Sequence, residues 1–447
     1  MSAAADLSLL STADQAGAAP FHALDFSPRP PDSLDEAGLS PELIEQIITK
    51  MLFQHGEMSG WDLSLAIGLR FSLIEGALET LKRKHLALVK RSLGLAGVTA
   101  VFALSDEGRT QAREFMDLTQ YMGAAPVPIE QYVEQVRRQR VPEGWLTPEK
   151  LAQAYRHMVV TPRVLSQIGP AVSAGKSMLI YGQPGNGKTY LAEALMNLDD
   201  TPIYIPHSVL CRGNIIRVFD PVQHHAIEDD TAATLFSANG AYDRRWVKCR
   251  RPFLISGGEL VLAALDLSYN PVSRVYDAPF QMKANNGMYL IDDFGRQTVS
   301  TADILNRWIV PMERRIDYLS FVSGSKMEVP FETFVIFSSN LKPEQLGDEA
   351  FLRRIQYKML LRSPETPEYR EIFVKFCDAK SLFFEPGDLD RFIERHYSAT
   401  GRPYRRCHPR DVVSHAIDMI HFEGLDYRLT ADLLDRAWES CFTQDVE

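Results

Sequence analysis

A glycine-rich run, Gly182–Thr189, is the segment of this chain whose chemistry is clearest. It follows the apolar segment Met178–Ile180 and opens the amphipathic segment Tyr190–Leu195, so we expect a strand, a loop and a helix in that order. Its three glycines let backbone N–H groups turn inward around a phosphate, and the following helix N-terminus adds positive potential. Lys188 would reach the β- and γ-phosphates, and the Thr189 hydroxyl would bind Mg²⁺. The sequence therefore predicts a site for a nucleoside triphosphate.

The alternative is a glycine-rich strand-to-helix turn that binds nothing. It is disfavoured because the Gly, Lys and Thr positions all match the phosphate-binding template. The residues expected to contact the nucleotide are nine consecutive ones: Gly182, Gln183, Pro184, Gly185, Asn186, Gly187, Lys188, Thr189 and Tyr190.

Two further apolar runs end in polar residues that suit the same site. Met288–Ile291 is followed by Asp292 and Asp293, and Phe334–Phe337 leads through two serines to Asn340. Asp292 is the expected magnesium carboxylate, and Asp293 is the candidate that orients or deprotonates an attacking water. Asn340 is placed to contact the γ-phosphate or that water. A buried strand ending in Asp is common in parallel sheets, so the prediction rests on all three elements together.

These motifs resemble those of the AAA+ superfamily of ring-forming ATPases, over roughly residues 146–447. The resemblance rests on Gly-x-Pro-Gly-x-Gly-Lys-Thr at Gly182–Thr189, on the acidic strand end at Asp292 and on the sensor-1-like Asn340. It implies ATP and Mg²⁺ as ligands, hydrolysis of ATP, and self-assembly into a homo-oligomeric ring such as a hexamer. The usual catalytic residue after the magnesium Asp is Glu. Asp293 is shorter by one methylene, so the resemblance implies hydrolysis without fixing its rate.

Two more segments look like AAA+ motifs that act on the γ-phosphate. Residues 348–355 resemble the arginine-finger segment, in which Arg353 or Arg354 would reach the nucleotide of a neighbouring subunit, with an ion pair inside one subunit as the alternative. His408–Asp411 resembles the sensor-2 start of a lid helix, which would place Arg410 near the γ-phosphate. The candidate catalytic residues are therefore Asp293, Asn340, Arg353, Arg354 and Arg410, and the candidate metal ligands are Thr189 and Asp292.

A β-hairpin is expected directly before the strand of Asn340, because Asp317–Val322 and Lys326–Val329 flank a Ser-Gly-Ser turn. It resembles the pre-sensor-1 insertion of the AAA+ branch that includes MoxR-like chaperones, magnesium chelatase subunits and bacterial enhancer-binding activators. In those families such loops face the central channel of a ring. Tyr269 and Tyr276 are then candidates for gripping a substrate, with local packing as the alternative.

The interval between the glycine loop and Asp292 is unusually long for two parts of one nucleotide site, which indicates an insertion. Within it we expect a hairpin from residues 203–210 and 215–219, a helix from Gly257 to about Leu267, and a loop over residues 268–280. A basic cluster with one tryptophan could bind nucleic acid or form an interface; it comprises Arg244, Arg245, Trp246, Lys248, Arg250 and Arg251.

Residues 40–122 resemble a winged helix-turn-helix domain. Helical spacing of apolar residues within 41–51, 61–67 and 71–84 is followed by two strands within 86–104 and by a Ser105-capped helix to about Met122. A DNA-reading helix would carry basic or amide side chains at its front. The third helix instead exposes Glu75 and Glu79, and the wing tip is uncharged. Protein contact is therefore favoured, while five basic residues keep DNA open: Lys82, Arg83, Lys84, Lys90 and Arg91.

Composition limits the class of protein further. The 447 residues carry a formal net charge of −10, which argues against a nonspecific nucleic-acid coat. The five cysteines are scattered without a Cys-x-x-Cys pair, so neither a zinc ribbon nor a disulfide framework is indicated, and a reducing cytoplasm fits best. No stretch approaches the roughly 18 apolar residues of a membrane span.

We therefore expect an α/β fold: a P-loop parallel-sheet AAA+ core with a C-terminal helical lid and an N-terminal winged-helix domain. The expected boundaries are a disordered tail over 1–39, the winged helix over 40–122, a linker over 123–145, the nucleotide domain over 146–362 and the lid over 363–447.

The expected function is ATP hydrolysis that remodels a protein partner. One alternative is a DNA-associated ATPase of the initiator, helicase-loader or transposition-helper type. Another is a nucleotide-gated scaffold that hydrolyses slowly.

Overall fold

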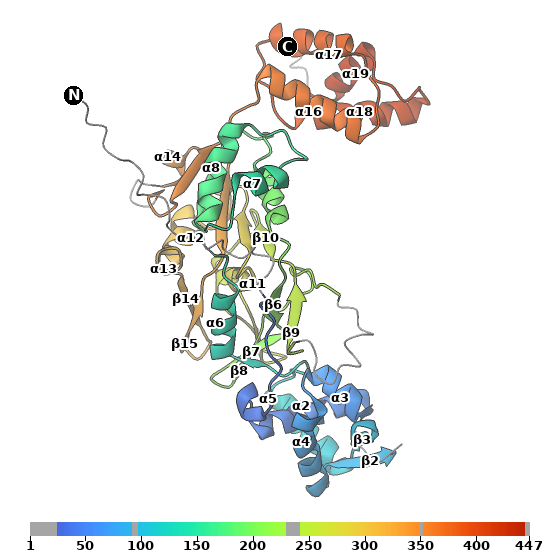
Figure 1. The fold of residues 1–447 in the computed structure, drawn as a ribbon, viewed down its shortest axis with the longest axis vertical. Coiled ribbons are helices and arrows are strands. Elements are labelled where there is room, and N and C mark those ends of the chain that lie inside the picture. The colour runs from blue at the N-terminus through green and yellow to red at the C-terminus, as the bar shows by residue number, and fades with distance from the viewer. Residues whose placement is uncertain (1–24, 92–96, 143, 229–241, 348–351, 443–447) are drawn as a thin grey trace, which may run out of the picture.

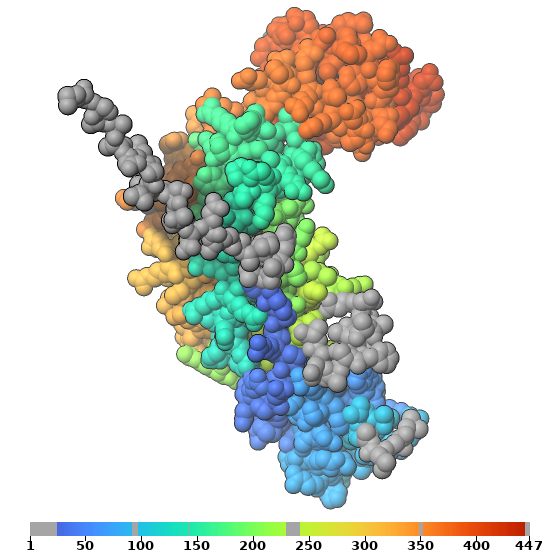
Figure 2. Space-filling view, in the orientation of Figure 1, coloured from blue at the N-terminus to red at the C-terminus, as the bar shows by residue number. Residues whose placement is uncertain are grey.

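The computed structural model describes residues 25–91, 97–142, 144–228, 242–347 and 352–442. The molecule is elongated, with an N-terminal domain at one end, a group of C-terminal helices at the other, and two α/β bodies between them (Figures 1 and 2). Each part encloses its own buried apolar cluster. Within the described residues, no helix combines the length and the apolar composition that crossing a bilayer requires.

The N-terminal domain runs helix, strand, helix, helix, strand, strand, helix. Its strand β3 lies between β1 and β2 in a three-stranded antiparallel sheet. Serine side chains at positions 40, 59 and 105 cap three of its helices, each accepting a backbone N–H from the first turn. The elements are α2 (Pro41–His55), β1 (Glu57–Ser59), α3 (Gly60–Ile67), α4 (Phe71–Arg83), β2 (Ala87–Arg91), η2 (Gly97–Thr99), β3 (Val101–Leu104) and α5 (Asp106–Leu118).

The predicted helices and wing strands of this domain are confirmed, with two differences. Helix α5 ends at Leu118 and not near Met122, and the three-residue strand β1 was not predicted. Most of the predicted wing tip, residues 93–96, lies outside the described residues.

The prediction of a disordered tail to residue 39 is wrong for residues 25–39. Phe26 is buried in the middle body, and Ala37 and Leu39 are buried in the N-terminal core. Between them, Ser33 caps the short helix α1 (Leu34–Ala37). Residues 1–24 lie outside the described residues. A single apolar anchor and one helical turn have no periodicity, so the pattern could not indicate this order.

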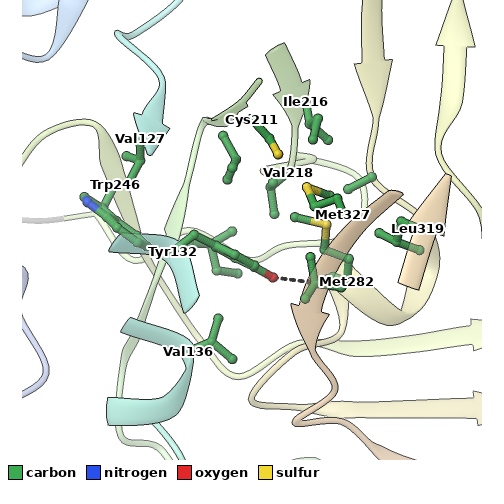
Figure 3. Close-up of a cluster of buried hydrophobic side chains, with 14 of the residues drawn as sticks. Val127, Tyr132, Val136, Cys211, Ile216, Val218, Trp246, Met282, Leu319 and Met327 are labelled. Carbon is green, nitrogen blue, oxygen red and sulfur yellow. Dashed lines mark hydrogen bonds between the residues drawn. The ribbon is translucent and has the colours of Figure 1, made fainter. Parts of the chain in front are cut away.

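The middle body is built on a mixed five-stranded sheet of order β11-β12-β8-β7-β4. Its side chains enclose the cluster of Figure 3, in which the Tyr132 hydroxyl donates to the Met282 carbonyl over 3.3 Å. The sheet strands are β4 (Val127–Pro128), β7 (Ser208–Cys211), β8 (Asn214–Arg217), β11 (Ser268–Asn270) and β12 (Val275–Asp277). Around them lie α6 (Ile129–Arg138), β6 (Ile203–Pro206), β9 (Trp246–Cys249), η4 (Leu262–Leu265), α11 (Phe280–Lys283), β14 (Ile316–Ser320) and β15 (Lys326–Pro330).

Both predicted hairpins are present in the middle body, as β7–β8 and β14–β15. Three other predictions are corrected. The helix expected over 257–267 is only the 3₁₀ turn η4, and the loop expected over 268–280 contains the hairpin β11–β12 and the turn α11. Residues 123–145 are not a free linker, because β4 pairs with β7 and α6 packs into the cluster.

The second α/β body has a parallel five-stranded sheet of order β10-β13-β16-β5-β17, which confirms the α/β class and the parallel sheet of the prediction. Side chains alternate between its faces, so Met178 and Ile180 enter one cluster while Leu179 enters the other. Its strands are β5 (Met178–Tyr181), β10 (Phe253–Ser256), β13 (Met288–Ile291), β16 (Phe334–Ser339) and β17 (Tyr357–Leu360).

Helices cover both faces of this sheet and complete a three-layered domain. The first face carries α7 (Pro148–Ala154), α8 (Pro162–Ser173), α9 (Lys188–Glu193) and the 3₁₀ helix η3 (Ala194–Leu198). The second face carries α12 (Thr301–Arg307), α13 (Ile309–Arg314) and α14 (Pro343–Leu346).

The C-terminal part is a domain built of helices. They pack around an aromatic core in which the Tyr369, Tyr397 and His408 side chains form a hydrogen-bonded chain with 2.9 Å links. The elements are α16 (Thr366–Ala379), α17 (Pro386–Ile393), the π-helical turn η5 (Glu394–Ser398), α18 (His408–Glu423) and α19 (Ala431–Cys441). All five cysteines of the chain are free thiols.

A buried arginine, Arg245, joins the N-terminal domain to the middle body. Its guanidinium pairs with Asp243 at 2.8 Å and donates to the Ala37 carbonyl at 2.8 Å and to Gln131 at 3.3 Å. Both charged side chains are almost fully buried. Nearby, Trp246 is buried as well. These residues of the predicted basic cluster therefore form an interface and not a free nucleic-acid surface.

Replacing Arg245 with leucine should loosen this junction, because it leaves the Asp243 carboxylate buried without its cation, at a cost of about 3–5 kcal/mol. We expect faster hydrogen exchange at two amides beside the junction, those of Ala125 and Asp243, which donate to Ile67 and Pro28. Exchange followed by mass spectrometry checks this, with the exposed Arg250→Leu as the control. Unchanged exchange at both amides in Arg245→Leu would contradict it.

Candidate functional site

The carboxyl ends of three neighbouring strands meet at one edge of the parallel five-stranded sheet, which is called the central sheet below. In the register, Ile291 lies opposite Phe337, and Phe337 lies opposite Leu179. The segments that follow β5, β13 and β16 therefore meet at the edge where open α/β sheets bind ligands. One link between these segments is a 2.7 Å hydrogen bond from the Thr189 hydroxyl to the Asp292 carboxylate.

The loop after β5 needs its glycines for conformation and for space. Gly185 and Gly187 have φ of +77° and +79°, in the left-handed region that favours glycine. At Gly182, a Cβ atom would lie 2.3 Å from the Leu361 carbonyl oxygen. Helix α9 begins at Lys188 directly after the loop, so its first backbone N–H groups face the site.

Lys188 is buried, and its ammonium is held inside the loop. Its Nζ donates to the carbonyls of Gly182 at 3.0 Å and Gln183 at 3.3 Å, and to the Asn340 side-chain oxygen at 2.6 Å. Burial lowers the pKa of Lys188, and the nearby carboxylates of Asp292 and Asp293 act in the opposite direction. The ammonium is thus oriented by neutral oxygens, an arrangement that suits an anionic ligand.

Asn340 connects Lys188 to the second acidic residue. Its side-chain N–H donates to the Asp293 carboxylate at 2.6 Å while its oxygen accepts from Lys188. Asp293 has φ of +49°, and its own N–H donates to Asp292 at 2.9 Å. This left-handed turn directs the Asp293 carboxylate back toward Asn340. The structure therefore brings together five residues of the predicted site: Lys188, Thr189, Asp292, Asp293 and Asn340.

The oxygen ligands of this site suit a magnesium-bound triphosphate. Hydroxyl and carboxylate oxygens are the ligands that Mg²⁺ prefers, and Thr189 and Asp292 present one of each at hydrogen-bonding distance. The side-chain oxygen of Asn186 is buried without a hydrogen-bond partner among the described residues. A polar atom in that state indicates room for a further polar contact in the loop.

The other predicted contact residues lie at the rim. Gln183 and Pro184 are exposed on the outer turn of the loop. Tyr190 is 53% exposed on α9, with its ring edge against His157 at a centroid distance of 5.9 Å. These three residues flank the site and do not line its buried part.

The predicted arginines do not reach this site. Arg353 is exposed, and Arg354 pairs with Glu313 at 3.5 Å, the intrasubunit alternative considered above. The start of their segment, residues 348–351, lies outside the described residues. Arg410 is exposed and pairs with its neighbour Asp411 at 2.8 Å.

The C-terminal domain instead reaches the loop with the turn before α18, a contact that the sequence did not indicate. The Cys407 backbone N–H donates to the Gly185 carbonyl at 2.9 Å, and a Cβ on Gly185 would lie 2.6 Å from the Cys407 sulfur. Arg405 donates to Ser363 at 2.5 Å, and Arg406 donates to the Val159 carbonyl at 2.9 Å. The predicted sensor-2 residue, Arg410, lies inside helix α18, whereas the observed contact is made by the turn that precedes this helix.

The Cys407 thiol offers a probe of this contact. Burial raises its pKa to about 11 from an ordinary 9.0, so only about one molecule in a thousand carries the thiolate at pH 8. We expect slow alkylation by iodoacetamide at pH 8, with a rate that rises with pH toward 11 and increases once the domain is unfolded. Mass spectrometry of the peptide containing Cys407 measures it. Labelling of the folded chain at pH 8 as fast as that of a free thiol would refute the contact.

Comparison with known proteins adds little to this geometry. Residues 365–440, in the C-terminal helical domain, match the model of a domain of unknown function, DUF8689. No match to a curated protein was found. NtrX from Brucella abortus is similar in structure over 73% of this chain and 59% of its own, with 12% identity and a TM-score of 0.36. A RuvB mutant from Thermotoga maritima is similar over 63% and 69%, with 15% identity and the same TM-score. At these values neither likeness identifies an activity.

Proposed function

We propose that this chain is an AAA+ ATPase that binds ATP with Mg²⁺ and hydrolyses it. The observation that carries the proposal is the set of contacts at three strand ends: Thr189 to Asp292, and Lys188 through Asn340 to Asp293. A strand edge with only a structural role would not need a buried ammonium, a hydroxyl, an amide and two carboxylates close together.

Each residue has a distinct role in this proposal. The loop N–H groups and Lys188 hold the β- and γ-phosphates, and Thr189 and Asp292 would hold Mg²⁺. When bound, that ion would neutralise charge on the phosphate oxygens. Asp293 orients the attacking water and accepts its proton, while Asn340 fixes the Asp293 carboxylate at 2.6 Å.

The C-terminal domain acts as a lid in this proposal, and Arg405 is the better candidate than Arg410 for sensing the γ-phosphate from it. Its side-chain carbons would lie 3.7–3.8 Å from a Cβ on Gly185. Its guanidinium bonds only to neutral oxygens among the described residues, those of Ser363 and Tyr404. Arg406, by contrast, is committed to Glu368. Because Cys407 touches the loop directly, a change in the loop on hydrolysis would shift the lid.

We further propose that copies of the chain assemble into a ring, with the exposed Arg353 supplied to a neighbouring nucleotide site. The β14–β15 hairpin is the proposed pre-sensor-1 element. Its aromatic neighbours favour local packing over substrate contact, because Tyr276 is buried and its ring lies tilted against that of Tyr269, with a centroid distance of 4.8 Å. The five reduced cysteines are in keeping with a cytoplasmic location.

The N-terminal domain is proposed to be a winged helix that recruits a protein client. Three of its five candidate basic residues pair with carboxylates of the same domain: Lys82 with Glu79, Lys84 with Glu45 and Arg91 with Glu57, at 2.7–2.9 Å. Their charge is thus already compensated. The described residues of this domain also expose five large apolar side chains, namely Trp61, Leu65, Leu88, Val89 and Leu118, which favours a protein partner over DNA.

Replacing Asp293 with asparagine should lower the ATP hydrolysis rate by about 10²- to 10⁴-fold and leave ATP affinity nearly unchanged, because it removes the proton acceptor alone. Replacing Lys188 with alanine should abolish ATP binding. Steady-state phosphate release and equilibrium titration with a fluorescent ATP analogue measure the two effects. Asp200→Asn, an exposed carboxylate outside the cleft, is the control. ATP binding that survives Lys188→Ala would sink the proposal.

The partner class has its own test. We expect duplex DNA to change the ATPase rate by less than about twofold, and Glu79→Ala to strengthen DNA binding because it frees Lys82. Fluorescence anisotropy with labelled duplex, at low and at physiological salt, gives both affinities. DNA that strongly stimulates the wild-type ATPase, with binding lost steeply on adding salt, would favour the DNA-associated alternative instead.

A further inference from the structure

A cavity of about 490 Å³ lies at the opposite edge of the central sheet from the nucleotide loop. Its wall includes Phe253, Met288 and Phe334, the first residues of β10, β13 and β16, whereas the nucleotide site is built at the last residues of these strands. The volume falls within the roughly 300–1,000 Å³ typical of small-molecule sites. None of the residues assigned to ATP lines it.

The cavity combines apolar walls with an excess of positive charge. Four cationic side chains line it against two carboxylates among the described residues, in a chain whose net charge is −10. The cations are Arg140, Lys176, Arg251 and Arg315, and the carboxylates are Asp199 and Glu332. Its apolar lining includes Trp145 and Met196 in addition to the strand residues.

The two carboxylates do not compensate all of this charge. Asp199 is taken by Arg251 at 2.6 Å, and Glu332 lies 3.5 Å from Arg140. Arg315 makes no ion pair within the described part of the chain, and its guanidinium donates to the Gly175 carbonyl. Burial lowers the pKa of Arg315, and the Glu332 carboxylate, which lies beyond ion-pair distance, acts in the opposite direction. A partly buried guanidinium whose recorded partner is a neutral oxygen gains strongly from an anion beside it.

The backbone at Arg315 is a second, independent observation. Arg315 closes helix α13 with φ of +59°. A residue with a Cβ in this conformation costs about 1–2 kcal/mol, and glycine or asparagine usually occupies such a helix end. An arginine held there against that cost indicates a use for its side chain at the cavity.

We propose that this cavity binds a small organic anion, with its acidic group against Arg315 and its apolar part between Phe253 and Phe334. The ligand class is an aromatic or aliphatic carboxylate, sulfonate or phosphate small enough for the volume.

The cavity is also joined to the nucleotide loop by one helix. Helix α9 begins at Lys188 and continues as η3, whose Leu195, Met196 and Leu198 line the cavity. An occupant therefore packs against the far end of the helix that presents Lys188. Binding of the anion changes ATP affinity, and ATP changes the affinity for the anion by the same factor. This coupling rests on the proposed function, whereas the anion site does not.

The anion site is tested with 8-anilinonaphthalene-1-sulfonate, an aromatic sulfonate whose fluorescence rises in apolar sites. The full chain carries Lys188→Ala, so that the nucleotide loop does not bind the probe. We expect one saturable site, a Kd raised about tenfold or more by Arg315→Gln, and no change with the exposed neighbour Arg314→Gln. Ser173→Phe, which fills the cavity without changing its charge, should also weaken binding.

Circular dichroism confirms the fold of each variant, and Ser173→Phe decides the outcome if Arg315→Gln does not fold. Equal Kd values for the parent and the folded cavity variants would overturn the site. The coupling is measured in the wild-type chain by ATP titration with and without saturating probe. A shift in ATP Kd of less than about twofold overturns the coupling alone. Failure of ATP to bind at all overturns the proposed function and leaves the anion site standing.

Discussion

The buried ammonium of Lys188 is the constraint around which the central domain is organised. A charge out of water is costly unless polar groups are aimed at it, and here two loop carbonyls and the Asn340 oxygen meet that need. To hold these oxygens in place, the loop adopts left-handed conformations that favour glycine at Gly185 and Gly187. A triphosphate would replace neutral oxygens with anionic ones at the same ammonium, so the Lys188 charge would be stabilised most when a nucleotide is bound.

The strands that carry the acidic and amide residues are anchored at their other ends in the middle body. Asn285, just before β13, donates to the Tyr132 hydroxyl at 2.9 Å and to the Pro330 carbonyl at 3.0 Å. Asn286 donates to the Val136 carbonyl at 2.8 Å. Pro330 ends β15, and β16 follows four residues later. The middle body, which was predicted to be an insertion, therefore supports the starts of β13 and β16, the two strands whose ends form the site.

The chemistry of the site was predictable because it is local in sequence. A strand, a glycine loop and a helix follow one another around Lys188, and each acidic or amide residue directly follows an apolar run. The corrections concern short elements whose partners are distant. Strand β4 has two residues and pairs with β7 about 80 residues later, and the hairpin β11–β12 joins β8 some 60 residues before it. The contact between the Arg405 turn and the glycine loop was not predicted for a related reason, since no periodic pattern marks a contact made by a loop.

The same anchoring decides how a change at the nucleotide can reach a partner. Were residues 123–145 a free linker, the N-terminal domain would respond to nothing in the body that carries the glycine loop. Instead β4 belongs to the middle sheet, and Arg245 ties that body to the domain through Ala37 and Asp243. A displacement of β13 or β16 would therefore be passed through packed elements to the N-terminal domain. The two ends of the molecule differ in how they contact the loop: the C-terminal domain touches it directly, while the N-terminal domain is linked to it through packed strands.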